Sequence, residues 1–115
     1  MPLISINTVK TLSKEQKTEI KTRLGKMIQI LPGKEESGLM VAISCGCTIF
    51  DAGVEAADAA FVDIRLFHES PFEAKKEFHK AFSDMLGEVA GIDPQHLVCN
   101  YIELPNWGGR AGVFR

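Results

Sequence analysis

The second half of this chain repeats the apolar pattern of the first half at a fixed offset of 58 residues, and no gap is needed. Residues related by this offset are apolar in both halves or glycine in both: Ile4 and Val62, Ile6 and Ile64, Ile20 and Phe78, Leu24 and Phe82, Met27 and Met85, Ile28 and Leu86, Leu31 and Val89, Gly33 and Gly91, Leu39 and Leu97. Two unrelated amphipathic segments can also match by chance. The full agreement of the helix positions favours a duplicated unit, with repeats at about residues 2–45 and 60–103.

Each repeat has the pattern of a β-α-β unit. Alternating apolar residues predict strands at 3–7, 39–44, 60–67 and 97–103. The first helix is predicted to begin after a capping box of Ser13 and Gln16 and to end at Pro32-Gly33. The second is predicted to begin at a capping box in Ser70-Pro71-Phe72-Glu73, with proline at its first position, and to end at Gly91.

A helix that crosses over between two strands returns the chain parallel to the first strand. Two such units predict an α/β fold, an α+β sandwich whose four-stranded mixed sheet carries both helices on one face. Alternation places five residues on the uncovered face: Leu3, Ser5, Asp63, Arg65 and Phe67. An uncovered, half-apolar sheet face favours association. We therefore expect an oligomer whose sheets face inward.

Length and charge narrow the possible functions. With 115 residues and a net charge of −2, the chain is predicted to be a single domain, residues 1–115, without the basic surface that nucleic-acid binding needs. No apolar run reaches the ~18 residues that cross a bilayer, and no signal peptide is visible, so neither a membrane nor secretion by a signal peptide is expected. Three cysteines, an odd number, favour a reducing, cytoplasmic setting.

The chain begins Met1-Pro2, directly before the first strand. Pro2 is either a residue that only precedes the strand and has no chemical role or, after removal of Met1, an N-terminal secondary amine. Such an amine is basic and rigid. Burial or a neighbouring cation disfavours its charged form and lowers its pKa towards neutrality, which suits a base that moves protons to and from carbon.

Four segments carry a resemblance to a known family: MPLISINT at the start, LPGK at 31–34, VCNY at 98–101 and NWGGRAGVF at 106–114. Together with the repeat, they make the chain similar to the tautomerase superfamily, in the branch of macrophage migration inhibitory factor. The resemblance covers essentially the whole chain. It implies a homotrimer and the keto–enol tautomerisation of an α-keto acid such as phenylpyruvate, with no cofactor and no metal.

The resemblance also implies roles for particular residues. Pro2 takes the place of the catalytic base, and Lys34 that of the lysine that binds the substrate carboxylate. Asn100 matches an asparagine that reaches the neighbouring subunit's site. Phe67 matches a residue that supplies a backbone contact and an apolar wall. Trp107 is a further candidate for the wall or for a trimer contact.

The chain also departs from the family pattern. Val98 stands where many relatives carry tyrosine, and the tail at 109–112 differs from the usual Asn/Ser/Thr-rich ending. The relatives' Cys-x-x-Cys is absent, since residues 58–62 read DAAFV.

Two other functions stay open on the residues alone. One is a non-catalytic, cytokine-type binding trimer that keeps the assembly without the chemistry. The other is a related dehalogenation, hydration or decarboxylation, for which Arg65 and Arg110 are the available extra cations. Arg65 is equally well placed to pair with Asp63 or with a neighbouring subunit.

Cys45-Gly46-Cys47 resembles a metal or redox pair. A zinc site needs two further ligands at suitable spacing, and none follows nearby. We therefore expect no metal there and a buried free thiol at Cys45, which ends a strand. His68, His79 and His96 are scattered and show no ligand spacing.

Overall fold

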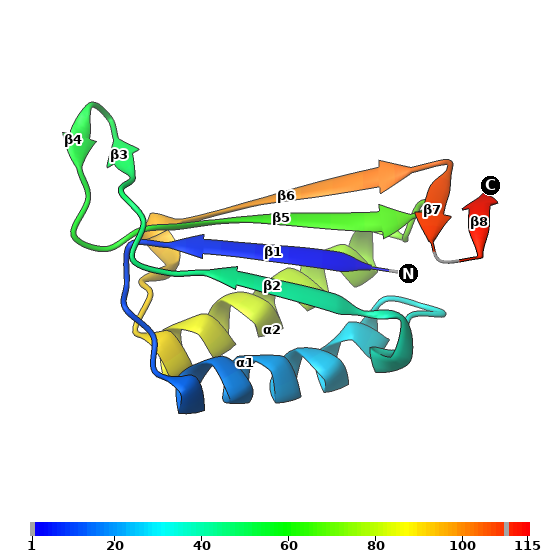
Figure 1. Ribbon diagram of the computed structural model, residues 1–115, viewed down its shortest axis with the longest axis horizontal. Coiled ribbons are helices and arrows are strands. Elements are labelled where there is room, and N and C mark those ends of the chain that lie inside the picture. Colours follow the sequence, from blue (N-terminus) through cyan, green and yellow to red (C-terminus); the bar gives the residue numbers. More distant parts are fainter. Residues whose placement is uncertain (1, 110) are drawn as a thin grey trace.

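The computed structural model describes residues 2–109 and 111–115. A four-stranded sheet lies over two helices that share one of its faces (Figure 1). The principal elements follow the predicted order: β1 (Leu3–Thr8), α1 (Lys14–Met27), β2 (Met40–Ser44), β5 (Ala60–Phe67), α2 (Phe72–Ala90) and β6 (Leu97–Leu104). The predicted mixed sheet and two-layer fold are confirmed.

The strands lie in the order β2-β1-β5-β6. The outer pairs, β1 with β2 and β5 with β6, are parallel, because each is joined by a helix that crosses over. The two parallel pairs have the same register. Leu3 pairs with Met40, and Phe61 and Val98, both 58 residues further on, pair with each other. The offset seen in the sequence is therefore a structural repeat.

The two units meet at the antiparallel pair of β1 and β5. There Ser5 lies opposite Asp63, its own equivalent 58 residues later. The β-α-β units are thus related by an approximate two-fold axis that passes between these two residues. Ile4 and Ile6 pair with Ile64 and Val62 on either side of this point.

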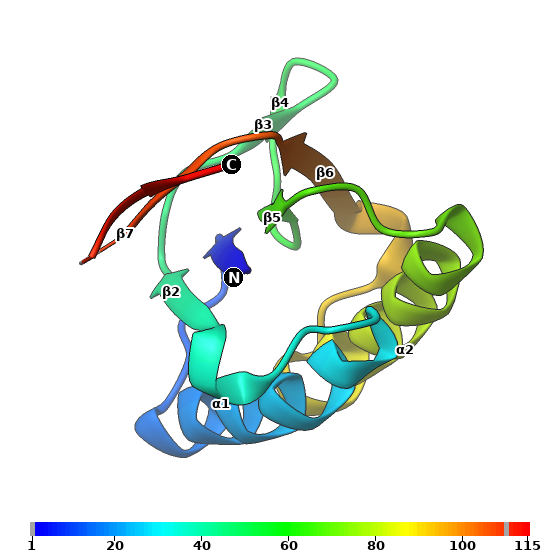
Figure 2. The ribbon, with the colours of Figure 1, turned by 90° about the vertical axis from the view of Figure 1, so that its right-hand side faces the viewer.

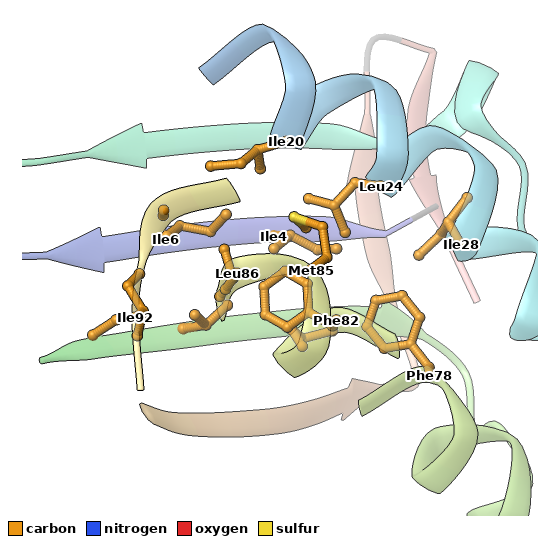
Figure 3. Packing of buried hydrophobic residues seen from close by; sticks show 14 of the residues in the cluster. Ile4, Ile6, Ile20, Leu24, Ile28, Phe78, Phe82, Met85, Leu86 and Ile92 are labelled. Atoms are coloured by element: carbon orange, nitrogen blue, oxygen red, sulfur yellow. The ribbon is translucent and has the colours of Figure 1, made fainter. Parts of the chain in front are cut away.

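The core lies between the sheet and the helices (Figure 3). The predicted helix faces supply most of it: Ile20, Leu24, Ile28, Leu31, Phe78, Phe82, Met85 and Leu86 are fully buried, and Met27 and Val89 are partly buried. They pack on the inward residues of the central strands, which are Ile4, Ile6, Val62, Ile64 and Leu66. Each such side chain contributes about 1.5–3 kcal/mol by leaving water, so this interface holds the two layers together.

The helix ends follow local chemistry, with one correction. The capping box of α1 is present, with the Ser13 side chain accepting from the Gln16 N–H and the Gln16 side chain from the Ser13 N–H. The predicted capping box of α2 is wrong. Pro71 is the N-cap residue and gives no side-chain cap, while the N–H of the buried Ser70 donates to Glu103 Oε2 at 2.6 Å. Glu103 thus fixes the backbone just before the start of α2.

Two short hairpins extend beyond the predicted elements. β3 (Phe50–Asp51) and β4 (Val54–Glu55) project from one end of the sheet, and β7 (Trp107–Gly109) and β8 (Gly112–Phe114) lie at the other end, near the N-terminus (Figure 1). The described residues also contain three 3₁₀ turns: η1 (Ile28–Ile30), η2 (Glu36–Gly38) and η3 (Pro94–His96). The second hairpin matters for the site described below.

The face of the sheet opposite the helices is open, as the alternation predicts. Large apolar side chains are exposed on it, including Phe61 at 41% and Val98 at 60%. Met40 adds a third at 68%, on edge strand β2. Within the described part of the chain, no helix is long and apolar enough to cross a membrane.

Candidate active site

Pro2 is buried at the head of β1. Its carbonyl accepts a hydrogen bond from the Met40 N–H at 3.0 Å, which extends the parallel ladder to β2. On the other side, Leu3 pairs with Arg65, so the antiparallel register sets Pro2 level with Leu66 of β5. The residue is therefore held between two neighbouring strands.

A groove of about 590 Å³ opens at this end of the sheet. The strand head, the η2 turn and the β7 hairpin line it: Pro2, Leu3, Ser37, Gly38, Leu39, Met40, Trp107, Gly108 and Gly109. Figure 2 looks onto this end and shows β7 arching beside the N-terminus and β2. Segments from the beginning, the middle and the end of the chain thus meet around Pro2.

Sequence reasoning missed the contribution of Ser37 to Met40. A signal for it was present, since β2 runs parallel to β1 and the start of one must lie beside the start of the other. The turn that leads into β2 therefore belongs to the same end of the sheet as Pro2.

Lys34 reaches this end from the turn after α1. The Lys34 N–H donates to the Leu31 carbonyl at 3.1 Å, and Gly33 adopts φ +77°, a left-handed conformation that glycine accepts without strain. From this turn, Lys34 Nζ donates to the carbonyl of Phe67 at 2.9 Å. Phe67 is one register position beyond Leu66, so the ammonium group lies near the level of Pro2.

Phe67 and Trp107 lie side by side, with ring centroids 6.2 Å apart. The ring of His68 stacks on Phe67 at 3.9 Å. His68 has φ +68°, which is uncommon outside glycine, and its N–H donates to the Leu104 carbonyl at 2.8 Å. The end of β5 is thus fixed in a bent conformation that holds its last carbonyl against Lys34.

Glu103 is a second residue near Lys34 that sequence reasoning did not find. Its Oε1 accepts from Lys75 Nζ at 2.8 Å and its Oε2 from the Ser70 N–H. Burial alone would raise the pKa of this carboxyl, but these hydrogen bonds and the charges of Lys75 and Lys34 lower it overall. Glu103 is therefore a fixed negative charge close to the lysine.

Asn100 and Arg65 do not line the groove beside Pro2 in the same chain. Asn100 is exposed on β6, and its Nδ2 donates to Asp63 Oδ1 at 3.2 Å. Through Asp63 it lies level with Ser5, two strands across and three residues along from Pro2. Arg65 is exposed on the open face. Arg110 lies outside the described residues.

Within residues 2–109 and 111–115, no three His, Cys, Asp or Glu side chains lie close enough to hold a metal ion. The absence of metal and cofactor from the reaction stays a prediction. The groove itself offers apolar walls and a proline at the strand head; Lys34 and Phe67 lie at the same end of the sheet but are not among the residues that line it.

No protein-family model matches the chain, and no curated protein sequence matches it. Solved structures do. MIF2 from Leishmania major has a TM-score of 0.88 and 20% identity, over 99% of this chain and 97% of that chain. Pt0534, solved after inactivation by 2-oxo-3-pentynoate, has a TM-score of 0.84 and 18% identity, over 96% and 93%. The Q0 fused 4-OT, a symmetric trimer, has a TM-score of 0.83 and 17% identity, over 96% and 93%.

This chain has the fold of macrophage migration inhibitory factor and the tautomerases. The predicted resemblance is confirmed at the level of the fold, and the match extends over nearly the full length of both chains. In this MIF-like fold, the two β-α-β units and the C-terminal hairpin together form the end of the sheet that holds Pro2.

Proposed function

We propose that this chain, once Met1 is removed, is a tautomerase that interconverts the enol and keto forms of an α-keto acid such as phenylpyruvate. The observation that carries the proposal is the place of Pro2. It is buried at the head of β1 beside an apolar groove, and the Lys34 ammonium is held by the carbonyl of Phe67, one register position beyond the level of Pro2. The likeness to Pt0534, which 2-oxo-3-pentynoate inactivates, supports a 2-oxo acid as the substrate class.

The reaction needs a base that is uncharged at neutral pH. Apolar neighbours and a nearby cation disfavour the protonated form of an amine and so lower its pKa. The Pro2 nitrogen takes the proton of the enol hydroxyl and returns it to the neighbouring carbon. Lys34 binds the substrate carboxylate, Trp107 and Phe67 contact the aromatic ring, and the groove limits access of water.

We further propose that the active form is a homotrimer whose open sheet faces lie inward. The exposed Phe61 and Val98 support this, because they form an apolar surface without cover in one chain. The symmetric trimer of the fused 4-OT is a precedent for the fold. In such an assembly Asn100, which is remote from Pro2 of its own chain, hydrogen-bonds a substrate oxygen in the neighbouring site. The odd number of cysteines favours a cytoplasmic setting.

The test is ketonisation of enol-phenylpyruvate by protein whose first residue has been verified by intact mass. We expect activity from protein that begins at Pro2 and a smaller rate for Pro2→Gly, which keeps a primary amine but loses the rigid ring. A chain with an uncleavable residue before Pro2 keeps the groove but turns the amine into an amide. Because this chain has no base at that position, it should lose about 10²–10⁴-fold in kcat/KM, the range that general-base catalysis supplies.

A covalent probe separates catalysis from binding. Incubation with 2-oxo-3-pentynoate should add the mass of the reagent to the N-terminal peptide and abolish activity, and the extended chain should not react. If the processed protein is a trimer that neither turns over phenylpyruvate nor reacts with the probe, the non-catalytic binding trimer is the correct function.

A further inference from the structure

A pair of cysteines lies at the opposite end of β1 from Pro2. They flank Gly46 in the turn that follows β2, and this turn is tied to the loop that follows β1. The Gly46 N–H donates to the Lys10 carbonyl at 2.8 Å. The Cys47 N–H and its thiol both contact the Thr8 carbonyl, each at 3.1 Å. The two cysteines are thus fixed on one short segment of backbone.

The surroundings of Cys45 differ from those of a structural thiol. Cys45 is half-buried and packs against the core, and its thiol has Leu12 and Lys17 as neighbours. There the Leu12 N–H and the Lys17 ammonium lower its pKa, although burial opposes them. Lys17 is half-buried, unlike the exposed Lys21 one turn later. Lys10, on the same loop, is directed away to Asp58 at 3.6 Å.

Cys99 provides the contrast within the same chain. Both thiols pack against the core, but Cys99 lies on β6, where burial raises its pKa to about 12. A thiol of this kind is almost never a thiolate at neutral pH and reacts slowly.

The turn also brings the two cysteine backbones together. Two peptide units in extended conformation span about 7 Å, at the limit of what a disulfide bridges, since its Cα atoms lie ~4.4–6.8 Å apart. Gly46 has φ +71°, so the chain folds back at the central residue and shortens this span. A β-carbon at Gly46 would meet nothing within 4 Å, so the conformation, rather than space, requires the glycine.

We propose that Cys45 and Cys47 are a peroxide-reactive dithiol that closes to an intramolecular disulfide. The Cys45 thiolate attacks one oxygen of hydrogen peroxide, the O–O bond breaks, and the second oxygen leaves as water after it takes a proton. The resulting Cys45 sulfenic acid is attacked by the Cys47 sulfur, which loses its proton as the sulfenic oxygen leaves as a second water. Two thiols are oxidised by two electrons and one peroxide is reduced to two waters.

The disulfide is reopened by a low-molecular-weight thiol, which attacks one sulfur and frees the other. Oxidation removes the Cys47 thiol from the Thr8 carbonyl and locks the turn after β2. Because this turn lies at the far end of β1, the chemistry does not depend on Pro2 or on the proposed tautomerase activity.

The test is oxidation of the fully reduced full-length chain with one equivalent of hydrogen peroxide, followed by intact mass and peptide mapping. We expect a loss of two hydrogens, a peptide that links Cys45 to Cys47, and full return on reduction. Cys99→Ser should behave like the parent chain. Cys47→Ser should stop at a Cys45 sulfenic acid that dimedone traps, and Cys45→Ser should not form the disulfide.

A pair of lysine variants tests the source of the reactivity. Lys17→Met should slow alkylation of Cys45 at pH 7, by up to about tenfold for each unit by which the thiol pKa rises, whereas Lys21→Met should not. In the parent chain, Cys45 should alkylate at least about a hundredfold faster than Cys99. The proposal is overturned if the disulfide involves Cys99 or a second chain, or if Cys45 reacts no faster than a thiol in the unfolded protein.

Discussion

The Lys34 side chain is held in place at the candidate site by a hydrogen bond within the chain. Its ammonium donates one hydrogen bond to the Phe67 carbonyl, and this leaves two N–H donors for a substrate. Because the carbonyl fixes the nitrogen, little side-chain entropy remains to be lost when a carboxylate binds. The hydrogen-bond partner of Lys34 is thus a backbone group, while the nearby carboxylate of Glu103 is held by Ser70 and Lys75.

We predict that Lys34→Ala lowers kcat/KM for an α-keto acid by about 10–100-fold, because a hydrogen bond to a charged group is worth about 1.5–3 kcal/mol. Lys26→Ala, an exposed lysine at the end of α1, is the control and should leave the rate unchanged. Steady-state kinetics with enol-phenylpyruvate would reject the role of Lys34 if both variants matched the parent chain.

Glu103 gives a prediction about stability. Since its pKa is lowered in the folded chain, its contribution is present above its ordinary value of 4.5 and is lost as pH falls through the folded pKa. Glu103→Gln should therefore reduce the free energy of unfolding by about 1 kcal/mol at pH 7 and by less at pH 3. Urea unfolding of both chains across this range measures the difference, and an equal difference at both pH values would contradict it.

Some residues at the site were predictable and others were not. Pro2 is conspicuous in the sequence because it directly precedes the first strand, and Lys34 was proposed through the resemblance to a family that carries a lysine after its first helix. Glu103 escaped notice because its partners, Ser70 and Lys75, lie about 30 positions away, and the strand pattern records only that residue 103 is polar.

At the scale of elements, the turn between α1 and β2 decides where Lys34 lies. The turn needs a left-handed residue, and Gly33 supplies it at φ +77°. We predict that Gly33→Ala costs about 1–2 kcal/mol of stability and lowers kcat/KM through displacement of Lys34.

The matched control is Gly87→Ala inside α2, where the new β-carbon would lie 3.5 Å from the Ile92 carbonyl, an ordinary contact. It should stabilise the chain by up to about 1 kcal/mol. Thermal unfolding measures both variants, and shifts of the same sign would contradict the prediction.

Sequence patterns predicted the principal elements because each buries an apolar face with a definite period. The start of α2 shows the limit. The segment Ser70-Pro71-Phe72-Glu73 fits a capping box, yet the carboxylate of Glu103 on β6 accepts the hydrogen bond of the Ser70 N–H. The short hairpins were missed for a related reason, since residues such as Val54 and Val113 are 68% and 79% exposed and leave no burial pattern.

At the scale of the whole molecule, the open sheet face is an apolar surface that a single chain leaves uncovered. We predict that Val98→Asp dissociates the oligomer, because it would place a charge within an apolar contact. Phe72→Asp, an equally exposed apolar residue at the start of α2 on the other side of the molecule, is the control and should not. Sedimentation equilibrium distinguishes the outcomes, and a trimer that survives Val98→Asp would rule out inward-facing sheets.

The role of Asn100 rests on the proposed trimer, because the resemblance assigns this residue to the site of a neighbouring chain. Its position on β6 follows from the strand pattern, but its partner in the same chain is Asp63 and not the groove. Only the geometry of an assembly determines which site such a residue serves.

The two β-α-β units carry different chemical groups at equivalent positions. Carried forward by 58 residues, Pro2 becomes Ala60 and Lys34 becomes Ile92, and both of these are buried among apolar neighbours. The second unit thus reproduces the scaffold of the first but keeps neither its amine nor its cation. Ala60 pairs with Thr8 at the far end of β1 from Pro2, so the end of the second unit that matches the candidate site is packed into the core instead of lining the groove beside Pro2.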